Sequence, residues 1–334
     1  MLFRSDPEMI SEARRLAAGA ERAVVFIGLT EVFESEGFDR EHLRIPENHI
    51  ALLDAVCEVQ KEVVVVLQNG APIEMPWVDK PKAILESYLA GEASGGAVAD
   101  LLFGLASPSG KLAETFPRHR NQSPSHLNFP GSRKEVEYRE GIFVGYRYYD
   151  TASVEPLFPF GHGLSYTTFT YGDPKLSKRK IKDDENLRVT VEVTNSGEVP
   201  GREIVQLYVR DTEAQVLRPE KELKEFASVK LQPGETSVIS FELGPRAFAY
   251  WEERENAWRV EGGSYEILIG GSSREIRGRS IVEIKERSPR KKVYDFNTTL
   301  EELSEKNAGK MLYDRILKEW KASGSDSDEA ESAM

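Results

Sequence analysis

The stretch AVVFIGL (23–29) is almost wholly apolar, and EVVVVLQNG (62–70) repeats the pattern further along the chain. Strands of a parallel sheet read as continuous apolar runs, because helices bury both faces of the sheet. The two stretches therefore predict two parallel strands of an α/β domain, each buried on both faces. Since ligands of such sheets bind beyond the carboxyl ends of the strands, a site is expected in the residues that follow each run.

The residues between and after these strands carry helix signals. Pro46 suits the first turn of a helix. The apolar residues that follow it recur at helical spacing: Ile50, Leu53, Val56 and Cys57. The run 82–91 is ambiguous between strand and loop, whereas 92–104 predicts a helix closed by Gly104. This alternation predicts an open, mostly parallel sheet with flanking helices over residues 1–165.

The second half of the chain changes to period-two alternation, interrupted by Asn, Gly and Pro turns. Five segments have this pattern: LRVTVEVTN (187–195), EIVQLYVRD (203–211), ELKEFASVKLQPGE (222–235), TSVISFEL (236–243) and GSYEILIGGSS (263–273). The alternation is typical of an antiparallel β-sandwich, which we expect over residues 166–286.

The last part of the chain predicts a helical extension over residues 287–322 and a disordered acidic tail over 323–334. Residues 298–320 have a helical pattern with a break near Asn307–Gly309. Their apolar residues are spaced to dock on another surface: Leu312, Ile316 and Trp320. The ending SGSDSDEAESAM is too polar and acidic to pack.

Composition narrows the function classes. The 334 residues are 40% hydrophobic and 30% charged, which suits a soluble protein of about two domains. A formal net charge of −12 argues against nucleic acid as a partner, because phosphate binding needs a basic surface. No apolar run could span a membrane and the start lacks the core of a secretory signal, so a cytoplasmic location is expected. The single cysteine, Cys57, falls in a helical apolar pattern and predicts a buried, unreactive thiol.

The stretch ESEGFDR (34–40) follows the first predicted strand and is the best candidate for chemistry. One interpretation is a solvated loop in which Asp39 and Arg40 pair across a turn. The other is a general acid, because a nearby carboxylate and burial under a ligand both raise the pKa of a carboxyl group. Spacing alone does not choose between Glu34 and Glu36.

Other chemistries find little support in the sequence. Five histidines are scattered with no pair at ligand spacing, so no metal site is expected. No nucleotide-binding or nucleophile-elbow motif is found, and no cofactor is expected. Four aromatic residues could stack on sugar faces, pack in a core or seal a domain junction: Phe143, Tyr146, Tyr148 and Tyr149.

Five blocks, in order, resemble the family 3 glycoside hydrolases, the β-glucosidases and their relatives. They are GLTEVFESEGFDREHLRIPENH (28–49), VVVVLQNGAPIEMPW (63–77), ADLLFGLASPSGKLAETFP (99–117), GIFVGYRYYD (141–150) and PLFPFGHGLSYTTF (156–169). TNSGEVPGREIVQLYVRD (194–211) and RPEKELKEFASVKLQPGE (218–235) resemble the fibronectin type III-like domain of the same family. A match to five ordered blocks is far more specific than any one motif.

The resemblance implies retaining hydrolysis of a β-linked glucoside or oligosaccharide, in which an aspartate of a (β/α)8 barrel attacks the anomeric carbon. A glutamate in a loop that ends Glu-Gly-aromatic-Asp-Arg then acts as general acid and base. On this chain that glutamate is Glu36, with Glu34 as the reserve candidate. Asp39 and Arg40 would hold the loop.

The barrel that should precede these blocks is missing from the sequence, and so are the usual opening strands of the α/β domain. We therefore expect the C-terminal part of a larger enzyme, inactive without a partner. That partner would be a separate barrel chain or a missing N-terminal portion. The alternative is a non-catalytic remnant, or a module that binds carbohydrate or protein.

Overall fold

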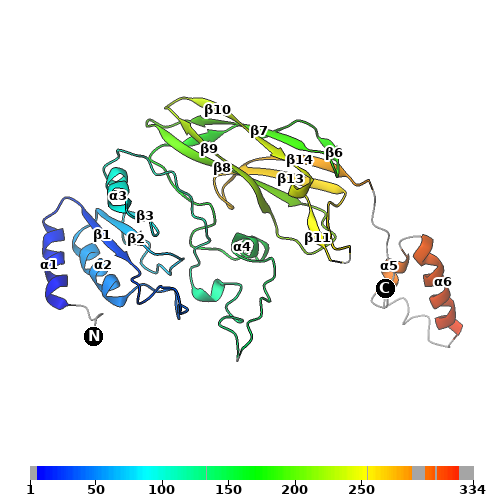
Figure 1. The fold of residues 1–334 in the computed structure, drawn as a ribbon, viewed down its shortest axis with the longest axis horizontal. Helices are drawn as coiled ribbons and strands as arrows, with labels where there is room; N and C mark the ends of the chain where they lie inside the picture. The colour runs from blue at the N-terminus through cyan, green and yellow to red at the C-terminus, as the bar shows by residue number, and fades with distance from the viewer. Residues whose placement is uncertain (1–5, 133, 254, 288–297, 305–306, 323–334) are drawn as a thin grey trace. The chain divides into compact units, whose positions relative to one another are not determined.

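The computed structural model describes residues 6–132, 134–253, 255–287, 298–304 and 307–322 (Figure 1). The chain forms two compact units, Met1–Arg287 and Ser288–Met334. The first unit contains an α/β part, an irregular segment and a β-sandwich, and the second unit contains two helices.

The α/β part is built on a parallel sheet of three strands in the order β1-β2-β3. The strands are β1 (Ala23–Gly28), β2 (Val63–Gln68) and β3 (Ala83–Glu86). Three helices accompany them: α1 (Pro7–Ala18), α2 (Glu47–Val59) and α3 (Ser94–Leu102). In Figure 1, α1 and α2 lie side by side next to the sheet, and their apolar residues share one core with β1 and β2. This is the open α/β arrangement that the sequence predicts.

The core of the α/β part is mainly aliphatic. Leu53 of α2 is fully buried, as are Val65 and Leu67 of β2, and Trp77 is 1% exposed. Full burial of an aliphatic side chain of this size stabilises a fold by roughly 1.5–3 kcal/mol. Cys57 lies in the same core, where burial raises the pKa of its thiol. The prediction of a buried cysteine is confirmed.

Strand β1 departs from the prediction that both of its faces are buried. Val25 and Ile27 are buried, but Val24 and Phe26 are 45% and 53% exposed. The core that β1 shares with α1 and α2 contains Val25 and Ile27 but neither Val24 nor Phe26, so only one face of this strand is covered. The central strand β2 has the expected burial, with Val66 also fully buried.

The remaining elements of the α/β part lie close to their predicted places. Pro46 is the residue that caps the N-terminus of α2, so the helix begins one residue later, at Glu47. The predicted helix over 92–104 is α3, and Gly104 follows it with a φ of +72°, a left-handed conformation that glycine adopts without strain. The ambiguous run 82–91 contains strand β3.

The irregular segment that follows α3 contains a short 3-10 helix, η1 (Arg120–Gln122), and the helix α4 (Tyr146–Thr151). Phe116 and Phe158 form an isolated antiparallel bridge, and their rings meet edge to face at 6.5 Å. Phe116 is 1% exposed and belongs to the core of the α/β part. The segment is therefore packed against this core, although it lacks regular structure.

The β-sandwich consists of two sheets, one in the order β10-β7-β4 with β5 also paired to β7, the other in the order β6-β14-β13-β8-β9. Their strands are β4 (Phe169–Tyr171), β5 (Lys175–Leu176), β6 (Lys180–Lys182), β7 (Leu187–Asn195), β8 (Gly201–Asp211), β9 (Glu222–Leu231), β10 (Thr236–Leu243), β13 (Gly263–Gly270) and β14 (Ile276–Lys285). A hairpin of β11 (Tyr250–Glu252) and β12 (Ala257–Arg259) follows the short helix η2 (Pro245–Ala247). The pairs are antiparallel as predicted, except that β6 and β14 are parallel.

Burial alternates from residue to residue along β7, which shows how the two sheets pack against each other. Leu187, Val189, Val191 and Val193 are at most 1% exposed, whereas the residues between them are exposed or half-buried. The buried residues share one core with those of β8 and β13 from the other sheet. One face of each sheet thus contributes to a shared apolar core.

The second unit contains α5 (Leu300–Ser304) and α6 (Asn307–Ala322). Thr299 and Glu302 form a reciprocal cap at the start of α5, with backbone-to-side-chain distances of 2.9 and 3.2 Å. The predicted break near Asn307–Gly309 does not occur at these residues, which form the first turn of α6. Of the apolar residues predicted to dock, Leu312 is 46% exposed. The predicted disordered tail lies outside the described residues.

None of the helices in the described part of the chain combines the length and the hydropathy that a membrane crossing requires.

Candidate active site

The carboxyl ends of the three parallel strands bring together three loops that are far apart in the sequence. The loop 29–46 follows β1, Asn69 and Gly70 follow β2, and Ser87 and Tyr88 follow β3. Ligands of open α/β sheets bind at this edge. The candidate residues of the sequence analysis all lie in the first of these loops.

Glu36 lies in a turn at the exposed part of the loop after β1. Its side chain is exposed, and among the described residues its carboxylate has no hydrogen bond or ion pair. The next residue, Gly37, has a φ of +90°, which a residue with a side chain rarely adopts. Phe38 is 50% exposed. The carboxylate of Glu36 is therefore free to contact a substrate.

Glu34 is held much more closely. Its Oε2 accepts a hydrogen bond from the backbone N–H of Gly70 at 2.6 Å, and its Oε1 lies 3.6 Å from Nη1 of Arg40. The side chains of Glu34 and Arg40 are 20% and 15% exposed. A hydrogen bond to a charged group stabilises a fold by about 1.5–3 kcal/mol. Glu34 thus fastens its loop to the loop after β2.

Arg40 and Asp39, the predicted loop supports, differ in their surroundings. Nη1 of Arg40 donates to the carbonyl oxygen of Pro72 at 3.3 Å. Burial lowers the pKa of the Arg40 guanidinium, and the nearby charge of Glu34 opposes this shift. Asp39 is exposed, and its carboxylate has no hydrogen bond or ion pair within the described ranges. Only Arg40 makes a supporting contact through its side chain.

A half-buried carboxyl group at the same edge is not among the predicted site residues. Glu86, the last residue of β3, accepts hydrogen bonds from the backbone N–H of Tyr88 at 2.8 Å and from Nδ2 of Asn69 at 3.3 Å. Burial raises the pKa of Glu86 to about 7, and the charges of Glu114 and Glu34 add to the shift. A carboxylate at the end of a short apolar strand was the available signal, but the run around it was ambiguous.

Asn69 and Tyr88 complete this cluster. Asn69 is fully buried, and its Nδ2 also donates to the carbonyl oxygen of Ala71 at 3.0 Å. Tyr88 has a φ of +48°, an uncommon conformation for an aromatic residue. Burial raises the pKa of its hydroxyl, as do the charges of Glu86 and Glu114. The loop after β2 is thus joined to the end of β3 by a partly buried hydrogen bond.

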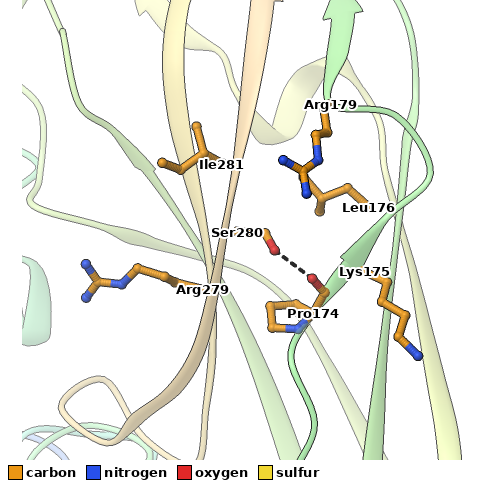
Figure 2. Close-up of a pocket in the computed structure, with 7 residues that line it drawn as sticks. All are labelled: Pro174, Lys175, Leu176, Arg179, Arg279, Ser280 and Ile281. Atoms are coloured by element: carbon orange, nitrogen blue, oxygen red, sulfur yellow. Dashed lines mark hydrogen bonds between the residues drawn. The ribbon is translucent and has the colours of Figure 1, made fainter.

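The described part of the first unit has one cavity beside the loop after β1 and another in the β-sandwich. A cavity of about 310 Å³ lies at the base of the loop after β1; its lining includes Phe33, His42, Pro46 and Glu74. The other, of about 500 Å³, lies in the β-sandwich between β5 and β14. Figure 2 shows that Arg279 and Lys175, which line this second cavity, point away from each other. Its cationic side chains do not converge on one point, as a site for an anion would require.

The aromatic residues of the segment before the sandwich have a packing role. The ring of Tyr146 stacks on Phe160 at 4.9 Å, and its hydroxyl accepts a hydrogen bond from the backbone N–H of Leu223 in β9 at 2.7 Å. Tyr149 is 4% exposed and meets Tyr148 edge to face at 5.6 Å. Of the roles open to these aromatics, sealing a junction matches the contacts of Tyr146. No group of His, Cys, Asp and Glu suited to a metal ion occurs in the described part of the chain.

Comparison with family models gives two matches. Residues 4–166 match the glycosyl hydrolase family 3 C-terminal domain, and residues 203–273 match the fibronectin type III-like domain. The first match contains the α/β part and the loop with Glu36, and the second lies within the β-sandwich.

Curated proteins and solved structures extend these matches over most of the chain. Thermostable beta-glucosidase B of Acetivibrio thermocellus is 51% identical over 314 residues, which are 94% of this chain and 42% of the relative. Exo-alpha-(1->6)-L-arabinopyranosidase of Bifidobacterium longum is 46% identical over 81% of this chain and 36% of its own length. The crystal structure of a GH3 beta-glucosidase from Bifidobacterium adolescentis aligns with a TM-score of 0.86 and 43% identity, over 93% of this chain and 46% of that one.

The chain thus spans less than half of the length of these relatives. The order of its parts, an α/β domain and then a fibronectin type III-like sandwich, is that of the matched models. The resemblance inferred from the five sequence blocks is confirmed, and the chain belongs to glycosyl hydrolase family 3, of which it carries the C-terminal domain and the fibronectin type III-like domain.

Proposed function

We propose that this chain is the C-terminal part of a retaining glycoside hydrolase of the β-glucosidase type, in which Glu36 is the general acid and base. The observation that carries the proposal is the contrast between the two candidate glutamates. The carboxylate of Glu36 is exposed and without a partner among the described residues, whereas that of Glu34 is engaged by Gly70 and Arg40.

This contrast matters because a general acid must reach the substrate and deliver a proton. Each oxygen of the Glu34 carboxylate already meets a partner, the N–H of Gly70 or the guanidinium of Arg40, which suits an anchor. Glu36 lies on a loop that follows a strand at the carboxyl edge of the sheet, where a ligand is expected.

The mechanism needs two carboxyl groups roughly 5–5.5 Å apart. A nucleophilic carboxylate forms a bond to the anomeric carbon while the bond from this carbon to the leaving oxygen breaks, and Glu36 gives its proton to that oxygen. Glu36 then removes a proton from water, whose oxygen attacks the anomeric carbon and releases the nucleophile. We infer that a (β/α)8 barrel portion, in the same chain or a separate one, supplies the nucleophile and shields Glu36 from water.

The substrate class follows from the relatives and is part of the proposal. Several are named β-glucosidases, and one is named for an α-(1→6)-linked L-arabinopyranoside. The aryl glycosides of β-D-glucose and α-L-arabinopyranose are therefore the substrates to compare. The barrel portion is expected to bind the sugar ring and therefore to determine which of the two glycosides is hydrolysed.

Reconstitution tests the proposal. The full chain is combined with the barrel portion, and hydrolysis of p-nitrophenyl β-glucoside is measured. Glu36→Gln should lower kcat by about 10²-fold or more, because a general acid contributes 10²–10⁴. Glu31→Gln, an exposed glutamate of the same loop, is the matched control and should leave kcat unchanged. Activity that is indifferent to Glu36→Gln would reject the assignment, and no activity with any barrel portion would favour an inert remnant or a binding module.

A further inference from the structure

The loop that carries Glu36 is fastened to the loop after β2 at two points. Glu34 Oε2 accepts the N–H of Gly70 at 2.6 Å, and Arg40 Nη1 donates to the carbonyl oxygen of Pro72 at 3.3 Å. The sequence places Glu36 between these points. The exposed turn with Glu36 is therefore bracketed by two contacts to one neighbouring loop.

The receiving loop is itself fixed. Asn69 is fully buried and donates from Nδ2 to Glu86 of β3 and to the carbonyl oxygen of Ala71. A Cβ added at Gly70 would lie 3.0 Å from Oε2 and 3.2 Å from Cδ of Glu34, so a side chain at this position would press on the contact. The fastening thus joins the exposed loop to a rigid part of the sheet edge.

We propose that Glu34 is a positioning residue, which holds the loop after β1 so that the carboxyl group of Glu36 stays where a leaving oxygen can meet it. The proposal rests on the proposed role of Glu36. Its physical basis is the sensitivity of proton transfer to geometry, since a displacement of about 1 Å can cost about 10²-fold in rate. Arg40 is the counter-ion of Glu34, with its Nη1 3.6 Å from Oε1, and helps to hold the carboxylate against Gly70.

A general effect on stability is distinguishable from positioning, because Glu34 lies outside the apolar core of the α/β part. Loss of its contacts should loosen the loop and leave the core intact. Glu34→Ala removes both contacts, whereas Glu34→Gln keeps an acceptor for the N–H of Gly70 and loses the charge that faces Arg40. Glu34→Ala should therefore loosen the loop more than Glu34→Gln does.

The first test uses the full chain alone and measures amide hydrogen exchange in the loop 29–46 and at Gly70. Glu34→Ala should speed exchange there by at least about tenfold, with a smaller effect for Glu34→Gln. Glu36→Ala and Glu31→Gln should leave it unchanged. Unchanged exchange in Glu34→Ala, in a protein whose thermal unfolding matches the parent, would overturn the proposal.

The second test combines the full chain with the barrel portion and separates positioning from chemistry. Glu36→Ala should lose the alkaline limb of the pH–rate profile and regain turnover with azide, which attacks the glycosyl-enzyme without a base. Glu34→Ala should lower kcat by about 10²-fold at every pH, keep that limb and gain nothing from azide. Glu34→Gln should recover part of the loss. Azide rescue of Glu34→Ala would overturn the positioning role and identify Glu34 as the acid and base.

The two tests also separate this inference from the proposed function. Faster exchange in Glu34→Ala together with an unchanged kcat in Glu36→Ala would reject the assignment of Glu36 as acid and base and, with it, the group that Glu34 is proposed to position. If amide exchange in Glu34→Ala equals that of the parent while azide rescues Glu36→Ala, the positioning role of Glu34 is rejected and the proposed function is supported.

Discussion

The Nζ of Lys221 lies 2.7 Å from Oδ2 of Asp150, and the two side chains are 10% and 2% exposed. Asp150 belongs to α4, whereas Lys221 immediately precedes β9 of the sandwich. Nε of Arg274 lies 2.5 Å from the other oxygen of Asp150, and its Nη2 donates to the carbonyl oxygen of Tyr149 at 3.0 Å. One buried carboxylate thus joins α4 to two segments of the β-sandwich.

Asp150→Ala should therefore destabilise the chain by about 3–5 kcal/mol, because it leaves the buried ammonium group of Lys221 without its counter-ion and removes one of the two acidic partners of Arg274. Urea unfolding measures the loss. Glu155→Ala is the control, since Glu155 lies 3.7 Å from Arg274 but is 72% exposed, and it should cost less than about 0.5 kcal/mol. Similar losses in the two variants would mean that burial of the Asp150 pair is not what stabilises the junction.

The raised pKa of Glu86 predicts a pH-dependent stability. Its ordinary value is 4.5 and its value in the fold is about 7, so the folded chain binds this proton more tightly than the unfolded chain does. The stabilisation is fully present below pH 4.5, falls as the pH rises to about 7 and is flat above it. The difference corresponds to roughly 3 kcal/mol as an upper value.

Glu86→Gln removes the titrating group, so its free energy of unfolding should fall less than that of the parent between pH 5 and pH 8. Urea unfolding at four pH values in this range measures the difference. The control is Glu92→Gln, at an exposed site, which should keep the slope of the parent. A Glu86→Gln variant with the parent's slope would contradict the prediction. Burial also raises the pKa of Glu114, so some slope should persist.

Gly28, at the end of β1, should not tolerate a side chain. An alanine Cβ there would collide with the carbonyl oxygen of Gln68 and lie 2.7 Å from its carbonyl carbon, both on the paired strand β2. Gly28→Ala should cost about 2–3 kcal/mol in urea unfolding, because two backbones must separate. Gly19→Ala is the control, since the nearest atom to its Cβ is 3.8 Å away. Equal effects at the two glycines would contradict the close approach of β1 and β2.

The open face of β1 predicts self-association. Val24 and Phe26 are 45% and 53% exposed on neighbouring positions of that face, and exposed apolar surface favours contact between molecules. Phe26→Thr should reduce association in sedimentation velocity and change stability by less than about 1 kcal/mol. Leu217→Thr, which removes an exposed leucine elsewhere, should have little effect. Undiminished association in Phe26→Thr would show that another surface is responsible.

Local patterns in the sequence predicted most of the regular elements. LRVTVEVTN and TSVISFEL coincide with β7 and β10, because a strand with one buried face alternates at every residue. Strand β14 (Ile276–Lys285) was missed, since charged residues interrupt its apolar positions. Strand β6 pairs with β14 in parallel, and no short sequence pattern predicts this pairing.

The sequence by itself determined the class of the fold, the order of its parts and the family, because these follow from periodicity and from motifs within short stretches. Only the tertiary structure decided that Glu34 is engaged while Glu36 has no partner among the described residues, that the half-buried Glu86 lies beside Asn69, and that one face of β1 is open. Each of these depends on which loops and helices the order of the strands brings together. Distances between residues remote in the chain are set by that order, and no local pattern encodes them.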